Sequence, residues 1–132
     1  MSAIRGSCHC GAVQWTLASP PTQATACSCT ACRRYGTLWA YGVLGEDVSV
    51  SGRTERYVRE DIEAHLAFHF CPGCGAVACW LPLSEEGNQR CAVNLRLADP
   101  DEVAHVPVRR FDGFGSWTSL PDEGRTVGEV WF

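Results

Sequence analysis

The feature of this chain that most restricts its fold is the grouping of its cysteines. Seven of the nine cysteines stand in three short clusters, Cys8-His9-Cys10, Cys27-Ser28-Cys29-Thr30-Ala31-Cys32 and Cys71-Pro72-Gly73-Cys74. Thiolates this close in sequence can converge on one soft cation, whereas strands and turns by themselves need no such spacing. We therefore predict that the chain folds around zinc.

Two of the clusters together match a structural zinc site. Such a site takes four protein ligands in a tetrahedron, and Cys8 and Cys10 with Cys71 and Cys74 supply four. The second pair lies in a sequence typical of a zinc knuckle, whose glycines allow backbone angles that aim amide N–H groups at sulfur. His9 is an alternative ligand, but four sulfurs already suffice.

The remaining cluster, which we call the trio, offers only three sulfurs, from Cys27, Cys29 and Cys32. Three protein ligands and one open position are the arrangement in which zinc can bind water or a substrate, so we predict a catalytic site here. The alternative is a second structural zinc whose fourth ligand is Cys79, Cys91 or a histidine, and the residue count alone does not exclude it.

The cysteines have two other possible uses. A disulfide framework is disfavoured because the cysteine count is odd and the first residues lack the apolar core of a signal peptide, which predicts a cytoplasmic protein. A single seven-cysteine cluster stays possible, since Cys32 and Cys71 are 39 residues apart and the spacing does not decide whether their loops meet.

Length and charge limit the remaining possibilities. The 132 residues fit one domain spanning 1–132, and no run of apolar residues is long enough to cross a membrane. The formal charge of -4 disfavours nucleic-acid binding, which relies on surplus positive charge. All eleven basic residues other than histidine are arginine, so imine chemistry on a lysine is excluded. The sequence does not indicate an oligomeric state.

Short alternating apolar segments predict a fold built mainly from β-strands. Gly, Pro, Asp or Ser interrupts the chain about every ten residues, and the segments between them have the period of two that is typical of strands. The apolar positions that define the expected strands are Val13, Trp15 and Leu17; Val48 and Val50; Leu66, Phe68 and Phe70; Val77, Cys79 and Leu81; Cys91, Val93, Leu95 and Leu97; and a last strand over 127–132.

Helices are expected to be few and short. The best candidate is a turn over Thr30 to Tyr35 that Gly36 ends. The segments Ser84 to Arg90, Asp99 to Glu102 and Phe111 to Gly124 are interpreted as polar loops.

Several charged residues are candidates for the substrate site. Arg33 and Arg34 directly follow the third cysteine of the trio, where they can either bind a substrate carboxylate or offset the charge of the thiolates. His65 and His69 alternate with an apolar strand face, so one of them can reach the site as an acid or base. The alternative is that both histidines are ordinary surface residues without a role in the site.

Other chemically versatile side chains are assigned to the core. Cys79 and Cys91 occupy apolar strand positions, where a thiol packs as a small hydrophobe. The aromatic residues of the second half of the chain and of the segment after the trio can line a pocket, but core packing is the default in a β-rich domain. None of these is assigned to substrate: Trp39, Tyr41, Trp80, Phe111, Phe114 and Trp117.

The ordered motifs resemble one known family. Gly6 to Val13, Cys27 to Arg33 and Phe70 to Gly75 together are similar to the glutathione-dependent formaldehyde-activating family, which includes centromere protein V. The resemblance spans residues 6 to about 97, and Phe111-Asp112-Gly113 is similar to a bacterial subgroup. It implies an all-β single domain of the β-tent type with two zinc ions, one structural at Cys8, Cys10, Cys71 and Cys74 and one catalytic at Cys27, Cys29 and Cys32.

The resemblance also implies an activity. Family members are named for S-(hydroxymethyl)glutathione synthesis, which is a carbon–sulfur lyase reaction in the reverse sense. We therefore expect an enzyme that acts on the adduct of a small aldehyde with glutathione or a related thiol. The alternatives are a noncatalytic zinc module for a partner or a thiol adduct, and a zinc enzyme for another small electrophile. Asp61 to His65 departs from the family pattern, so a substrate bordering it is expected to differ.

Overall fold

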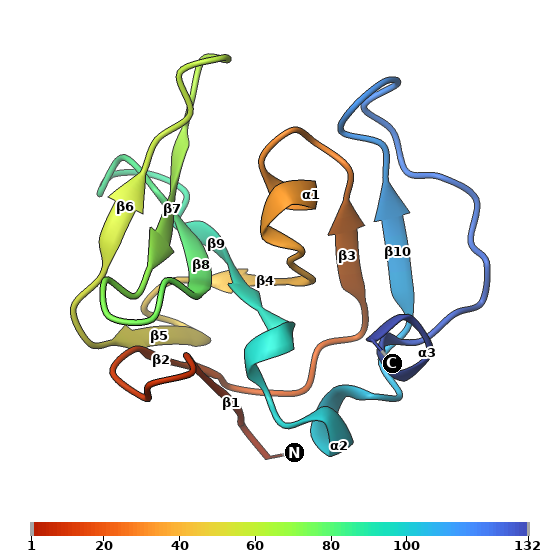
Figure 1. Ribbon diagram of the computed structural model, residues 1–132, viewed down its shortest axis with the longest axis horizontal. Helices are drawn as coiled ribbons and strands as arrows, with labels where there is room; N and C mark the ends of the chain where they lie inside the picture. The colour runs from red at the N-terminus through yellow and green to blue at the C-terminus, as the bar shows by residue number, and fades with distance from the viewer. Residues whose placement is uncertain (1, 132) are drawn as a thin grey trace.

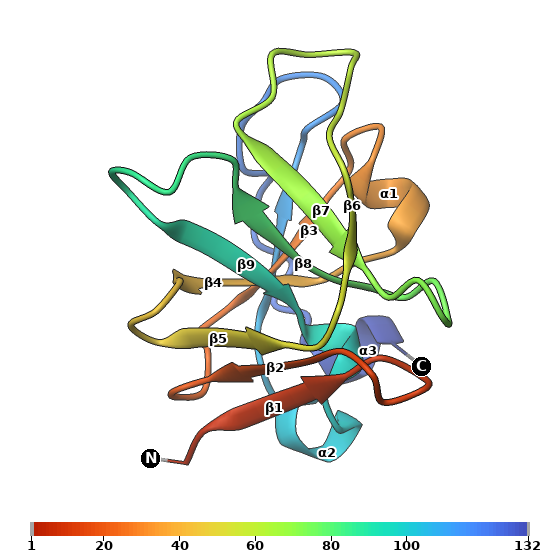
Figure 2. The same ribbon diagram turned by 90° about the vertical axis from the view of Figure 1, so that its left-hand side faces the viewer.

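The computed structural model describes residues 2–131 and confirms a mostly β fold. Its strands form two sheets (Figures 1 and 2), and none of its helices is long and apolar enough to cross a membrane. The smaller sheet has the order β1-β2-β5, with all pairings antiparallel. Its strands are β1 (Ile4–Ser7), β2 (Gln14–Leu17) and β5 (Val48–Ser51).

The larger sheet carries most of the chain and has the order β10-β3-β4-β9-β8-β7-β6. Only β10 and β3 run parallel, with Phe111 opposite Cys27, and the other neighbours are antiparallel. Its strands are β3 (Ala24–Cys27), β4 (Trp39–Val43), β6 (Glu55–Tyr57), β7 (Leu66–Phe70), β8 (Val77–Pro82), β9 (Arg90–Asn94) and β10 (Val108–Phe111).

The strands form where apolar residues alternate or run together. In β2, Trp15 and Leu17 are buried while Gln14 is exposed, as expected for a strand with one face on the core. In β9, Cys91 and Val93 are fully buried along with the residue between them, because this central strand is covered on both faces. Cys79 is also fully buried, so both of these thiols pack in the core as expected.

The helical segments are short, and three expectations about the secondary structure of the chain were wrong. The expected helix near the trio is α1 (Cys32–Tyr35), which ends where Gly36 takes φ 69° and donates its N–H to the Cys32 carbonyl. The expected last strand is instead α3 (Val127–Trp131), since Thr126 just before it donates its N–H and its hydroxyl to the Glu129 carboxylate. Residue 132 lies outside the described range.

Two further segments differ from the expectations. The strand expected to run to residue 97 ends with β9, because the Asn94 side chain accepts the Arg96 N–H and starts the 3-10 helix η1 (Leu95–Leu97). The acidic segment expected as a loop forms α2 (Pro100–Val103), since Asp99 caps it by accepting the Asp101 N–H.

Three loops meet at one end of the molecule and position the site described below. They are the connection from β3 to α1, the connection from β6 to β7 over residues 58–65, and the segment that follows β10 over residues 112–118. Figures 1 and 2 both show them at the same end, above the larger sheet. The β1–β2 connection and the β7–β8 turn lie away from this end.

Candidate metal centre and cavity

The structure gathers four cysteine sulfurs from two distant turns into one group. Those of Cys8, Cys10, Cys71 and Cys74 all lie within 4.8 Å of one another. The Sγ of Cys10 is 3.7 Å from that of Cys8 and 3.6 Å from that of Cys71. Zinc–sulfur bonds of about 2.3 Å at tetrahedral angles place ligand sulfurs roughly 3.8 Å apart, so this spacing fits zinc closely.

Backbone amides surround this four-sulfur group. Val13 donates its N–H to the Cys8 sulfur at 3.2 Å. The N–H groups of Ala76 and Cys10 lower the pKa of the Cys74 thiol to about 6. Such donors favour the thiolate form that a metal requires. The group joins the β1–β2 connection to the β7–β8 turn and so ties the two sheets together.

The three sulfurs of the trio form a separate group. The sulfurs of Cys27, Cys29 and Cys32 lie within 4.8 Å of one another, and among residues 2–131 no fourth cysteine, histidine or carboxylate joins them. The chain enters the trio at the end of β3 and leaves it in α1. A single seven-cysteine cluster is therefore not what the chain forms.

The thiols of the trio cannot all ionise by themselves. Hydrogen bonds from Cys27 and Cys32 lower the pKa of Cys29, whereas sharing a proton with Cys29 raises the pKa of Cys27. The same sharing, with Cys27 first and Cys29 second, raises the pKa of Cys32. A divalent cation in place of the shared protons would let all three act as thiolates, so the donor set fits zinc.

Two N–H groups fix the orientation of the trio. The Cys32 backbone N–H donates to the Cys29 sulfur at 3.2 Å, and the Trp39 indole N–H donates to the Cys32 sulfur at 3.3 Å. Trp39 is 1% exposed, so the second bond is sheltered from water. Donors of this kind orient metal ligands and tune their basicity.

The trio lies against a cavity of about 340 Å³, the size of a small-molecule site. None of the four-sulfur group lines it, so the two cysteine groups differ in their access to a ligand. Its other walls come from β4, β7, β8, β9, β10 and the loops that follow β6 and β10. The lining residues are Cys27, Cys29, Cys32, Trp39, Tyr41, Arg59, Ile62, Glu63, Ala64, His65, Leu66, Phe68, Trp80, Arg90, Arg109, Phe111 and Trp117.

The two arginines predicted to bind substrate do not line this cavity. Arg34 donates to the Thr30 carbonyl at 2.7 Å, and the Arg33 guanidinium lies 5.8 Å from the centre of the Phe114 ring. Both therefore brace the loops around the trio in this structure. Of the two candidate histidines, His65 lines the cavity, while His69 is hydrogen-bonded to Thr54 at 2.8 Å away from it.

Three other arginines line the cavity. Arg59 is paired with Asp61 through two bonds of 2.7 and 2.9 Å. Arg90 lies over the Tyr41 ring, with its guanidinium carbon 4.2 Å from the ring centre. The Arg109 side chain donates to the Thr25 hydroxyl at 3.4 Å, and its Nε is buried without a partner among the described residues. Sequence reasoning missed them because each reaches the cavity only through strand pairing or loop packing.

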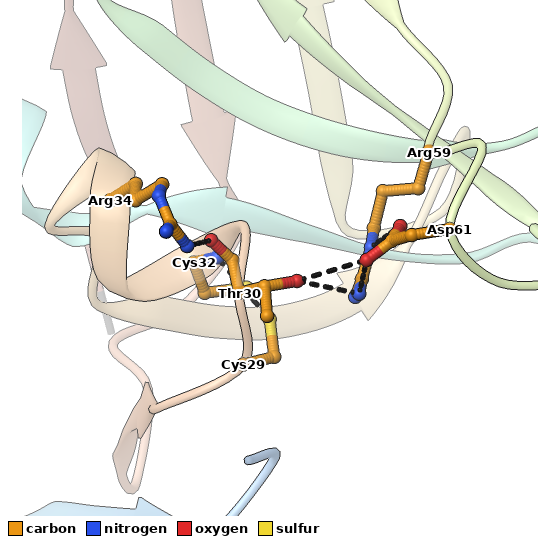
Figure 3. A network of polar contacts seen from close by, with 6 residues as sticks. All are labelled: Cys29, Thr30, Cys32, Arg34, Arg59 and Asp61. Carbon is orange, nitrogen blue, oxygen red and sulfur yellow. Dashed lines mark hydrogen bonds and ion pairs between the residues drawn. The ribbon is translucent and has the colours of Figure 1, made fainter.

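Arg59 also joins the 58–65 loop to the trio's loop. Figure 3 shows its guanidinium bonded to both Asp61 and the Thr30 hydroxyl, which lies between Cys29 and Cys32 in sequence. The Thr30 hydroxyl also donates to Asp61 at 3.1 Å. The Arg59 side chain is only 10% exposed. This network holds one cavity wall in register with the trio.

The loop after β10 covers the trio from the other side. Asp112 accepts bonds from the N–H groups of Gly115 and Ser116 at 2.8 and 2.9 Å, which stabilises the turn. Next to it, a Cβ on Gly113 would lie 2.8 Å from the Cys27 sulfur and 2.8 Å from the Cys29 Cβ. Only a residue without a side chain fits here.

Comparisons with known proteins agree with this geometry. Residues 3–111 match the sequence model of a family described as glutathione-dependent formaldehyde-activating enzyme. The fold is similar to the crystal structure of a Rhodobacter sphaeroides protein, a structural genomics target, with a TM-score of 0.60 and 26% sequence identity over 80% of this chain and 99% of that one. A search of curated proteins found no match.

Proposed function

Because this chain belongs to the glutathione-dependent formaldehyde-activating family, we propose that it is a zinc enzyme that joins the thiol of glutathione, or of a related molecule, to a small aldehyde. In the proposed reaction the S–H bond of the thiol breaks and the sulfur forms a bond to the carbonyl carbon. The carbonyl π electrons move to oxygen, and that oxygen takes up a proton in place of the one that the thiol released. The product is a thiohemiacetal. The reverse direction is the carbon–sulfur lyase reaction.

One observation carries this proposal: the cysteine group with three sulfurs opens on the cavity and the group with four does not. Four protein ligands complete a tetrahedral zinc, whereas three leave one position for a ligand from outside. We therefore assign a structural zinc to Cys8, Cys10, Cys71 and Cys74, and a catalytic zinc to the trio. Bound there, zinc supplies a Lewis acid that lowers the pKa of a thiol and offsets charge on a developing oxyanion.

The protein's own residues bind and orient the substrate in this proposal. Arg109 is the strongest candidate to hold a carboxylate of the thiol, because none of the described acidic residues forms an ion pair with it. Arg90 is a second cation that lines the cavity. His65 is the lining group that we assign to give the carbonyl oxygen its proton. The aromatic walls keep water from the reacting atoms.

The direct test is the rate at which free and bound aldehyde exchange. The addition also proceeds without a catalyst, so exchange NMR on a mixture of glutathione and formaldehyde should be compared with and without the zinc-loaded protein. We expect faster exchange with the protein. Exchange at the uncatalysed rate, together with four protein ligands around both zinc ions in X-ray absorption spectra, would instead identify a noncatalytic zinc module.

Replacing Arg109 with glutamine should separate carboxylate binding from support of the metal. With glutathione we expect KM to rise by about tenfold or more, because a charge-assisted bond to the carboxylate is lost. With 2-mercaptoethanol, which has no carboxylate, the rate should stay near that of the wild type. Equal losses with both thiols, or loss of zinc, would show that Arg109 only offsets the charge of the trio.

Replacing Gly113 with alanine should disrupt the trio although no metal ligand is replaced. The added methyl group has no space beside Cys27 and Cys29, so we expect the zinc content to fall from about two ions per chain toward one. Gly73→Ala is the matched control, since its Cβ would lie at an ordinary 3.7 Å from the Cys71 sulfur. Elemental analysis that finds the same zinc content in both variants would refute this packing argument.

A further inference from the structure

The mouth of the cavity exposes apolar side chains from two separate loops. Trp117 is 57% exposed and Ile62 is 43% exposed, and both line the cavity. They belong to the loop after β10 and to the 58–65 loop, which are far apart in sequence. Large apolar side chains exposed beside a cavity are typical of ligand-binding surfaces.

Trp117 is held in this position by its backbone. It is the only non-glycine residue with positive φ among residues 2–131, at 57°. Its N–H donates to the Asp112 carbonyl at 2.8 Å, and its ring meets Phe111 edge-on with the ring centres 5.9 Å apart. Non-glycine residues in this conformation are strained and gather at functional sites. The turn therefore maintains an exposed indole at the cavity mouth.

The inner walls continue this apolar surface as far as the trio. Tyr41 and Trp80 pack together with ring centres 6.0 Å apart, and both line the cavity. Phe68 lies beside Trp39, which is bonded to the trio. Aromatic side chains thus line the cavity beside the trio as well as at its mouth.

Formaldehyde makes no use of such a surface. Its adduct adds one carbon and one hydroxyl to the thiol, and the polar arms of glutathione are matched by the arginines rather than by aromatic rings. Resting on the function proposed above, we propose that the aldehyde taken by this site carries an apolar substituent of ring size, held between Trp117, Ile62 and the aromatic wall. Trp117 is then a specificity-determining residue.

Stable glutathione thioethers test this proposal without catalysis. We would titrate the zinc-loaded protein with S-benzylglutathione and S-methylglutathione by calorimetry, and follow the fluorescence of the lining tryptophans. We expect the benzyl conjugate to bind about tenfold more tightly or better, because its ring buries apolar surface that the methyl group leaves exposed. Equal affinities, or no measurable binding of the benzyl conjugate, would overturn the proposal.

A pair of variants from one loop locates the contact. Trp117→Ala should weaken binding of the benzyl conjugate by about tenfold and leave the methyl conjugate unchanged. Phe114→Ala is the control, since Phe114 is 72% exposed in the same loop but does not line the cavity. Unchanged benzyl binding in Trp117→Ala, or equal losses for both conjugates, would refute the role of Trp117.

The two proposals can fail separately. Accelerated exchange of glutathione with formaldehyde would support the proposed reaction. Equal affinity for the two thioethers in the same protein would refute the proposal that the aldehyde carries an apolar substituent. A clear preference for the benzyl conjugate without acceleration of any thiohemiacetal exchange would refute the catalytic activity. It would still support a binding site for apolar thiol conjugates.

Discussion

Replacing Cys29 with serine is expected to reduce the exchange of glutathione with aldehyde to the rate seen in buffer. Cys29 is the thiol of the trio whose pKa is lowered by hydrogen bonds from Cys27 and Cys32, and it is 4% exposed. A serine hydroxyl stays protonated at neutral pH and is a poor zinc ligand, so the remaining two sulfurs should not retain the ion. The zinc content should fall from about two ions per chain to about one.

The fold of this variant should survive, because the four-sulfur group is untouched. Circular dichroism should match the wild type, and the measurement is exchange NMR on matched protein concentrations. Cys79→Ala is the control, since it removes a fully buried thiol outside both groups and should leave exchange unchanged. A Cys29→Ser protein that exchanges substrate as fast as the wild type would eliminate the trio as the reaction site.

Replacing Cys71 with serine is expected to unfold the protein. Cys71 is 1% exposed and is one of the four sulfurs that tie the β1–β2 connection to the β7–β8 turn. In small zinc modules, metal binding contributes about 10–16 kcal/mol to folding. The total stability of a domain is about 5–15 kcal/mol, so losing this site exceeds what the apolar core can supply.

Thermal melts and circular dichroism check this expectation. The Cys71→Ser protein should lack a cooperative transition, and the wild type treated with a strong chelator should behave in the same way. Cys91→Ala, which removes a buried thiol elsewhere in the larger sheet, should cost about 1 kcal/mol, the common size for a single substitution. A Cys71→Ser protein that melts cooperatively at the wild-type temperature would show that this sulfur group does not hold the fold together.

The sequence predicted the parts of the site that depend on local spacing. Residues two or three positions apart, such as Cys29 and Cys32, stay close in almost any turn, so their sulfurs could be grouped before any fold was known. Joining Cys10 to Cys71 needed the further argument that zinc requires four ligands. Their sulfurs lie 3.6 Å apart in the structure, although the metal itself stays a prediction.

The cations of the cavity could not be predicted in the same way. Arg33 and Arg34 were chosen because they adjoin Cys32, yet a helical turn carries both side chains away from the cavity. Arg109 is 77 residues from Cys32 and reaches the site because β10 pairs with β3 in parallel. Local sequence preferences determine neither that strand pairing nor its register, so the sequence alone could not place Arg109 at the cavity.

The prediction of secondary structure failed where hydrogen bonds from polar side chains outweighed the apolar pattern. The segment from Val127 alternates weakly enough to suit a strand, but the bonds between Thr126 and Glu129 start a helix. Leu95 and Leu97 continued the alternation of β9, and the Asn94 side chain ended it. In both cases one side chain bonded to the backbone decided the conformation of the residues that follow.

The loop after β10 is fastened at its base, where it packs beside the trio. Asp112 donates its N–H to the Thr118 carbonyl, and Leu120 donates to the Arg110 carbonyl, so both ends of the segment are closed on each other. The family match ends at residue 111, just before this loop. Substitutions in this loop away from Gly113 should therefore reshape the entrance to the cavity while the sulfurs of the trio keep their positions.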